Sequence, residues 1–158
     1  DAALSFMLKG YTSQDILIQC KRLEQAGIEY GSFYLTSISG KGNGENGAKA
    51  SAEIFNQLHP FLIGPNMLTI YPESELYQEI QHGNWEAEGE IEKYRELRVL
   101  VENLNISTYF AAMGASNAFQ LQGLLPEDKE KLLETLDRII SEADETELLH
   151  YRKNLPHL

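Results

Sequence analysis

The residue types best suited to chemistry gather in a glycine-rich loop, residues 39–47, that follows an apolar run ending at Ile38. Four of its nine residues are glycine, and a helix-length segment begins near its end. Backbone N–H groups of such a loop can bind an anion at a helix N-terminus. The loop does not fit the phosphate-binding motif G-x-x-x-x-G-K-[ST], because Lys49 is followed by Ala50. It also does not fit the dinucleotide-binding motif G-x-G-x-x-G with a ribose-binding acid about twenty residues later, because no such acid follows. The pattern therefore predicts either a loop that contacts a ligand or a mobile surface loop.

A second candidate position lies on the next apolar run, residues 61–70, where Asn66 and Thr69 interrupt apolar side chains. A polar side chain on a buried strand needs a hydrogen-bond partner. That partner is either a ligand or a group on a neighbouring strand, and the sequence leaves both alternatives open.

Other reactive residue types give no comparable signal. The four histidines are scattered and show no metal-ligand spacing with Asp, Glu or Cys, so no metal site is expected (His59, His82, His150 and His157). The one cysteine, Cys20, has a helical pattern around it and is interpreted as a small core residue. No nucleophile can be identified, and the catalytic residues stay unknown.

The elements that position these residues follow a strand–helix–strand order. The apolar run 33–38, the helical pattern 48–58 and the run 61–70 predict a βαβ unit with parallel strands. In parallel α/β folds, ligands bind at the carboxyl ends of the strands. The remaining pattern predicts helices over 13–26, 74–81, 90–103 and from Pro126 onward, and strand character over 106–111.

Composition indicates a soluble domain of ordinary size. The chain has 158 residues, 42% hydrophobic and 23% charged, and no apolar run approaches the ~20 residues that span a bilayer. Without such a run, a membrane is not an expected partner. A net charge of -11 repels phosphate backbones, so nucleic acid is not an expected partner either. A single cysteine suits the reducing cytoplasm. Because residue 1 is Asp, we expect the chain to be part of a longer protein.

Several segments, taken in order, resemble the later part of a radical SAM barrel. They are the segment 25–28 before the first strand, residues 37–41 at its end, the helix 48–58, the strand and proline turn 63–77, and residues 116–133. The resemblance covers nearly the whole chain. It is to an uncharacterised Fe-S oxidoreductase branch, likened to oxygen-independent coproporphyrinogen III oxidase.

The resemblance implies the C-terminal half of a partial (βα)6 TIM-like barrel over residues 1–84, with a trailing helical extension over 85–158 packed on it as one unit. It implies a parent oxidoreductase that binds S-adenosylmethionine and a [4Fe-4S] cluster. The C-x-x-x-C-x-x-C motif that holds the cluster is absent here. We therefore expect that this chain alone binds neither cofactor and is inactive, and that its partner is the missing N-terminal half.

Carried over by position, the resemblance implies two sets of cofactor-binding residues. Ser37, Ser39 and Gly40 match the strand end that lies against the adenosyl group. Asn66, Met67 and Leu68 match the next strand, which contacts the adenine.

Two other functions stay open. One is a stand-alone α/β binding or interaction module that meets a partner through acidic helices over 90–103 and 127–144. The other is an aldolase-like barrel fragment with a lysine Schiff base, for which Lys41 and Lys49 are the candidates. An open sheet edge in a half barrel would also favour a homodimer. The substrate cannot be named from these residues.

Overall fold

The computed structural model describes residues 1–155, which form seven helices and four strands; His157 lies outside the described residues. The strands are β1 (Gly31–Leu35), β2 (Leu62–Asn66), β3 (Thr108–Ala112) and β4 (Leu121–Leu125). The helices are α1 (Ala2–Phe6), α2 (Ser13–Gln25), α3 (Gly44–Phe55), α4 (Glu75–Gln81), α5 (Glu90–Asn103), α6 (Lys129–Glu142) and α7 (Glu145–Lys153). No helix among these residues is long and apolar enough to cross a membrane.

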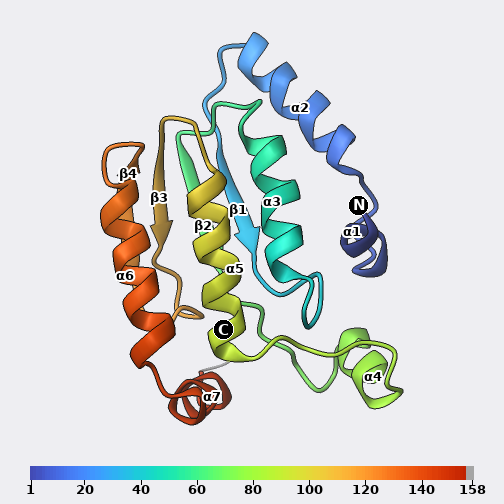
Figure 1. Cartoon of the computed structure of the whole chain (residues 1–158). Coiled ribbons are helices and arrows are strands. Elements are labelled where there is room, and N and C mark those ends of the chain that lie inside the picture. Colours follow the sequence, from blue (N-terminus) through green and yellow to red (C-terminus); the bar gives the residue numbers. More distant parts are fainter. Residues whose placement is uncertain (156–158) are drawn as a thin grey trace.

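The strands form one open sheet in the order β1-β2-β3-β4 (Figure 1). The first three are parallel, and β4 runs antiparallel to β3. The register places Phe33 opposite Gly64 and Tyr109 opposite Leu124. Because β1, β2 and β3 run the same way, the loops that follow them emerge at one edge of the sheet.

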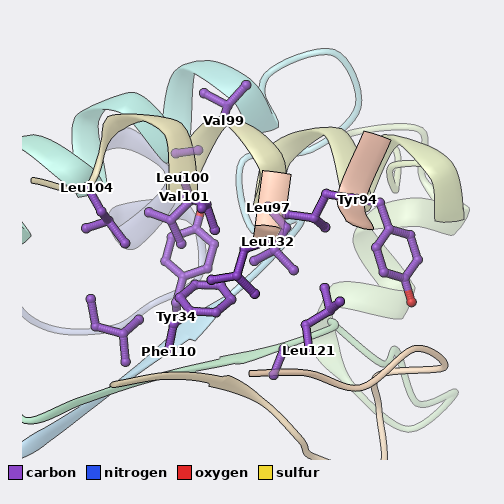
Figure 2. Close-up of a cluster of buried hydrophobic side chains, with 14 of the residues drawn as sticks. Tyr34, Tyr94, Leu97, Val99, Leu100, Val101, Leu104, Phe110, Leu121 and Leu132 are labelled. Atoms are coloured by element: carbon purple, nitrogen blue, oxygen red, sulfur yellow. The ribbon is translucent and has the colours of Figure 1, made fainter. Parts of the chain in front are cut away.

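Helices α3, α5 and α6 lie side by side over one face of this sheet (Figure 1). The central helix, α5, points Leu97 and Leu100 at Tyr34 of β1 and Phe110 of β3, and all four side chains are buried (Figure 2). This contact is the centre of the hydrophobic core, to which Leu132 and Leu136 of α6 also belong.

The opposite face of the sheet carries exposed apolar side chains. Successive residues of a strand point to opposite faces, so Tyr34 faces the helices while its neighbour Phe33 points away and is 80% exposed. On the same face, Tyr109 is 40% and Leu124 49% exposed. The sheet is therefore buried on one side and open on the other.

The structure confirms the predicted parallel βαβ unit and an α/β fold. Strand β1 is shorter than the predicted run, because a turn begins after Leu35 and Ser37 takes a left-handed φ of 69°. Strand β4 was not predicted, because its short pattern contains Gly123 and follows a small-residue loop. The segment after residue 84 supplies β3 and β4 as well as helices to the same sheet. The sheet is open and mixed, and a complete barrel is not formed by these residues.

Helix α2 begins as its sequence predicts. Thr12 and Asp15 form a capping box, in which the Asp15 N–H donates to Thr12 Oγ1 at 3.2 Å and the Thr12 N–H donates to Asp15 Oδ2 at 2.8 Å. Only Leu17 of this helix is buried. Thus α2 has an apolar stripe that is incompletely covered, beside the unpaired edge of β1.

Candidate functional site

A groove of about 990 Å³ opens at the carboxyl ends of β1 and β2. It lies between the N-terminal segment with α1 and the start of α2 on one side and α3 on the other, so it also passes the free edge of β1. Its apolar wall includes Phe33, Leu35 and Ile38, and its polar residues include Ser39 and Asn66. The groove therefore combines a flat apolar surface with hydrogen-bonding groups at the edge of the sheet where parallel strands place ligands.

Asn66 ends β2 and is held by the loop between β3 and β4. Ser116 Oγ donates to Asn66 Oδ1 at 3.4 Å, and the same hydroxyl accepts from the Met67 N–H at 3.1 Å. Since Asn66 Oδ1 is occupied, the amide nitrogen Nδ2 is the group that can donate to a ligand in the groove. Gly114 is required beside it, because a Cβ at that position would lie 2.1 Å from Asn66 Oδ1.

Asn117 is buried beside the cluster formed by Asn66, Gly114 and Ser116. Its Nδ2 donates to the Pro65 carbonyl at 3.0 Å, whereas its Oδ1 has no hydrogen-bond partner within residues 1–155. A buried acceptor without a donor is costly. In the sequence, Ser116 and Asn117 belong only to the last segment of the family resemblance, and their proximity to Asn66 comes from the pairing of β2 with β3.

The three predicted positions after β1 have different environments. Ser39 lines the groove, and its Oγ lies against Gly47 of α3, where a Cβ would be only 2.4 Å away. Ser37 is buried on the helix side, and its N–H donates to Glu96 Oε2 at 2.6 Å. Gly40 has φ 77° and lies under Trp85, whose Nε1 would be 2.9 Å from an added Cβ.

The predicted positions at the end of β2 and just after it also have different environments. Asn66 lines the groove, but Met67 is buried in the core, where its Sδ accepts from Thr36 Oγ1 at 3.3 Å. Leu68 is half-buried after the strand. Of the six predicted residues, the structure therefore brings the side chains of Ser39 and Asn66 together at the groove.

Two backbone N–H groups of the glycine-rich loop donate hydrogen bonds to other residues of this chain. The Lys41 N–H donates to the Glu86 carbonyl at 2.9 Å, and the Gly42 N–H donates to Glu92 Oε1 at 2.7 Å. Lys41 also forms an exposed ion pair with Glu86, and this contact raises the pKa of the lysine. A lysine that is held charged is a poor Schiff-base nucleophile. These contacts favour a structural role for residues 41 and 42.

A buried pair of carboxyl groups, Glu88 and Glu96, lies behind this loop. Glu96 accepts from Tyr34 Oη at 2.5 Å as well as from Ser37, and Glu88 lies directly over Gly44, whose missing Cβ leaves room for it. Burial, then a hydrogen bond and the negative charge of Glu96, raise the pKa of Glu88 to about 9. Glu88 is therefore protonated at neutral pH. Sequence reasoning missed this pair, because a spacing of eight residues across the start of α5 does not mark two acids as neighbours.

The described residues give little support to metal binding or to a reactive thiol. The described residues contain no group of three or more His, Cys, Asp or Glu side chains placed to hold a metal ion. The Cys20 thiol is partly buried near Tyr30, and burial raises its pKa. A thiol of raised pKa is a poor nucleophile and metal ligand.

Comparisons with protein-family models, with curated proteins and with solved structures found no match to this chain. Its function therefore has to be inferred from the groove itself. The groove offers an apolar wall beside Phe33 and Leu35, an amide donor on Asn66 and a hydroxyl on Ser39. Such a site can bind and orient a flat polar heterocycle with an attached chain.

Proposed function

We propose that this chain is the C-terminal part of a radical SAM oxidoreductase and forms one side of its S-adenosylmethionine site. One observation carries the proposal: helices α3, α5 and α6 cover a single face of a mainly parallel sheet, and the other face is apolar and open. In (βα) barrels the helices form an outer ring. Doubly wound sheets, by contrast, carry helices on both faces.

The free edge of β1 fits the same proposal. Within residues 1–155, strand β1 pairs with β2 only, and the groove separates it from the segment that carries α1 and the start of α2. A further parallel strand would pair with this edge and would cover the apolar stripe of α2. We propose the N-terminal half of the same protein as the source of that strand and of the cluster-binding cysteines.

The residues of the groove fit S-adenosylmethionine in chemistry. The aromatic ring of Phe33 and the side chain of Leu35 offer an apolar surface for the adenine, and Asn66 Nδ2 offers a donor for a ring nitrogen. The orphaned Asn117 Oδ1 lies in the adjoining cluster and would be satisfied by a hydroxyl or amino donor. When bound, S-adenosylmethionine supplies the bond whose reductive cleavage starts radical chemistry; the groove residues bind and orient it.

The residues present do not fit a [4Fe-4S] cluster. Such a cluster needs several thiolates, and Cys20 on α2 is the one cysteine in the sequence. No chemical step is assigned through a cluster on this chain, and no substrate is assigned. The proposal is limited to binding and orientation by β1, β2 and the loops that follow them.

Titration with S-adenosylmethionine, followed by amide chemical shifts, tests the proposal. The sequence leads us to expect no cofactor on this chain alone, but the groove supplies half of the site, so we expect weak binding, on the order of 1 mM, and shift changes centred on residues 33–39 and 66. Asn66→Ala should weaken it about five- to 150-fold, as expected for a lost polar contact. Asn105→Ala is the matched control, because Asn105 is exposed just before β3 at the opposite edge. Shift changes outside the groove, or none at several millimolar, would refute the proposal.

The position of α5 argues against the alternative that this chain is a partner-binding module. This helix lies between α3 and α6, and of its side chains only those of Arg95 and Glu102 are exposed. Two of its acids, Glu90 and Glu96, are buried. This helix is therefore a core element and does not offer a free acidic face. Helix α6, the other helix of this alternative, does keep acids exposed, at Glu130, Glu134 and Glu142.

A further inference from the structure

Helix α7 reaches the carboxyl edge of the sheet from the far end of the chain. We infer that Arg152 and Tyr151 of this helix are positioning residues that fix Ser116, and through it Asn66, in the geometry needed to bind a ligand in the groove. The inference deepens the proposed function and rests on it for the identity of the ligand. The contacts that run from Arg152 and Tyr151 through Ser116 to Asn66 form a relay, and this relay is a property of the free protein.

The first step of the relay is a guanidinium–carboxylate pair in which Glu90 is buried and Arg152 is half-buried. Arg152 donates to both oxygens of Glu90, from Nε at 3.0 Å and from Nη2 at 2.8 Å. Its third nitrogen, Nη1, donates to the Ser116 carbonyl at 2.8 Å and lies 3.5 Å from Thr69 Oγ1. The planar fork of an arginine fixes these directions together, which a lysine ammonium cannot do.

The carboxylate that holds Arg152 is itself rigid. Glu90 is buried at the start of α5, where Lys93 Nζ donates to it at 2.7 Å. Burial opposes the ionisation of Glu90, but hydrogen bonds and the positive charges of Arg152 and Lys93 outweigh it and lower the pKa of Glu90. The guanidinium is thus anchored in the body of the protein, and its contact with Ser116 transmits that position to the loop.

A second contact from the same helix holds the adjacent peptide. Tyr151 Oη donates to the Ala115 carbonyl at 2.7 Å. Two consecutive carbonyls of the loop between β3 and β4 are therefore fixed by neighbouring residues of α7. The Ser116 side chain then contacts Asn66 Oδ1 and the Met67 N–H, so the orientation of the loop decides where Asn66 points.

The other end of α7 has a separate anchoring role. Glu145 accepts from the N–H groups of Glu90 at 2.6 Å and Ile91 at 2.9 Å, which caps the N-terminus of α5. Its hydrogen bonds go to α5, not to the loop at residues 115 and 116. A substitution here weakens the cap of α5 without removing either carbonyl contact, which supplies a matched control.

The experiment compares Arg152→Lys and Tyr151→Phe with Glu145→Gln in the full chain. The first readout is the pair of side-chain amide resonances of Asn66 in the absence of ligand, assigned with Asn66→Ala. The second is the affinity for S-adenosylmethionine, and the third is the midpoint of thermal unfolding. We expect Arg152→Lys and Tyr151→Phe to shift the Asn66 resonances and to weaken binding about two- to tenfold, as for one lost hydrogen bond. Glu145→Gln should lower the unfolding midpoint and leave both other readouts at their wild-type values.

The outcomes separate the two proposals. Unchanged Asn66 resonances in Tyr151→Phe and Arg152→Lys would overturn the relay, as would an equal shift in Glu145→Gln. If the wild-type chain shows no binding of S-adenosylmethionine but the resonances respond as expected, the proposed ligand is wrong and the relay stands. Tyr151→Phe removes one hydroxyl from an exposed contact and keeps the ion pair, so it tests the relay even if Arg152→Lys does not fold.

Discussion

The buried acid Glu88 should make the stability of this protein fall as pH rises through neutrality, and Glu88→Gln should abolish this dependence. In the folded protein the Glu88 carboxyl is protonated beside Glu96, because its pKa is raised to about 9. In the unfolded chain the same group ionises near its usual pKa of about 4.3. Between these two values the folded state therefore binds one more proton than the unfolded state.

The sign and size of the effect follow from proton linkage. A pKa raised by folding stabilises the protein fully below the unfolded pKa, and this stabilisation is lost as pH rises through the folded pKa. A difference of one bound proton between the folded and unfolded states changes the free energy of unfolding by about 1.4 kcal/mol per pH unit. The free energy of unfolding should thus fall by about 3 kcal/mol from about pH 6 to about pH 8. Carboxyl groups with lowered pKa values, such as Glu90, act in the opposite sense and at lower pH.

Urea denaturation over this pH range measures the effect, with the single tryptophan, Trp85, as the fluorescent probe. Glu88→Gln keeps a hydrogen-bond donor toward Glu96 but cannot ionise, so its stability should be nearly independent of pH. Glu86→Gln is the control, since Glu86 is an exposed acid two residues away and should keep the wild-type slope. A flat wild-type profile, or a sloping one in Glu88→Gln, would show that Glu88 is not the group that stays protonated in the folded protein.

Three further substitutions test other parts of the structure. Gly114→Ala places a methyl group 2.1 Å from Asn66 Oδ1, so it should cost about 1 to 3 kcal/mol in urea denaturation, and wild-type stability would contradict the packing described. Thr12→Ala removes the side-chain cap of α2 and should cost about 1 kcal/mol, whereas Thr12→Ser should cost little; equal losses would argue against the capping box. Phe33→Ser removes the most exposed aromatic ring of the open face, so size-exclusion chromatography with light scattering should show less self-association and urea denaturation little change in stability. A wild-type chain that is monomeric at high concentration would refute this last expectation.

Much of the local structure could be predicted from residue spacing. The apolar stripe of α5, the capping box of α2 and the alternation of apolar run, helix and apolar run are short-range patterns, and they predicted the types and order of these elements. Their bounds differ, because α3 covers residues 44–55 and not 48–58, and β2 ends at Asn66 and not at residue 70. Parallel pairing of β1 with β2 follows from the helix-length connection between them, and it brings Ser39 and Asn66 to the same edge. These features depend on contacts within a few turns of the chain or on one crossover.

The tertiary structure decided which side chains face the groove and which face the core. Ser37 and Met67 belong to the segments predicted to contact a cofactor, but the segments that follow β1 and β2 direct them to buried partners. The pairing of Glu88 with Glu96 and the contact of Arg152 with Ser116 join residues that no periodicity relates, since Arg152 and Ser116 are 36 positions apart. Such contacts exist only once α5, α7 and the sheet have packed together. Spacing along a chain predicts local geometry, whereas the partners of buried polar groups depend on how distant elements meet.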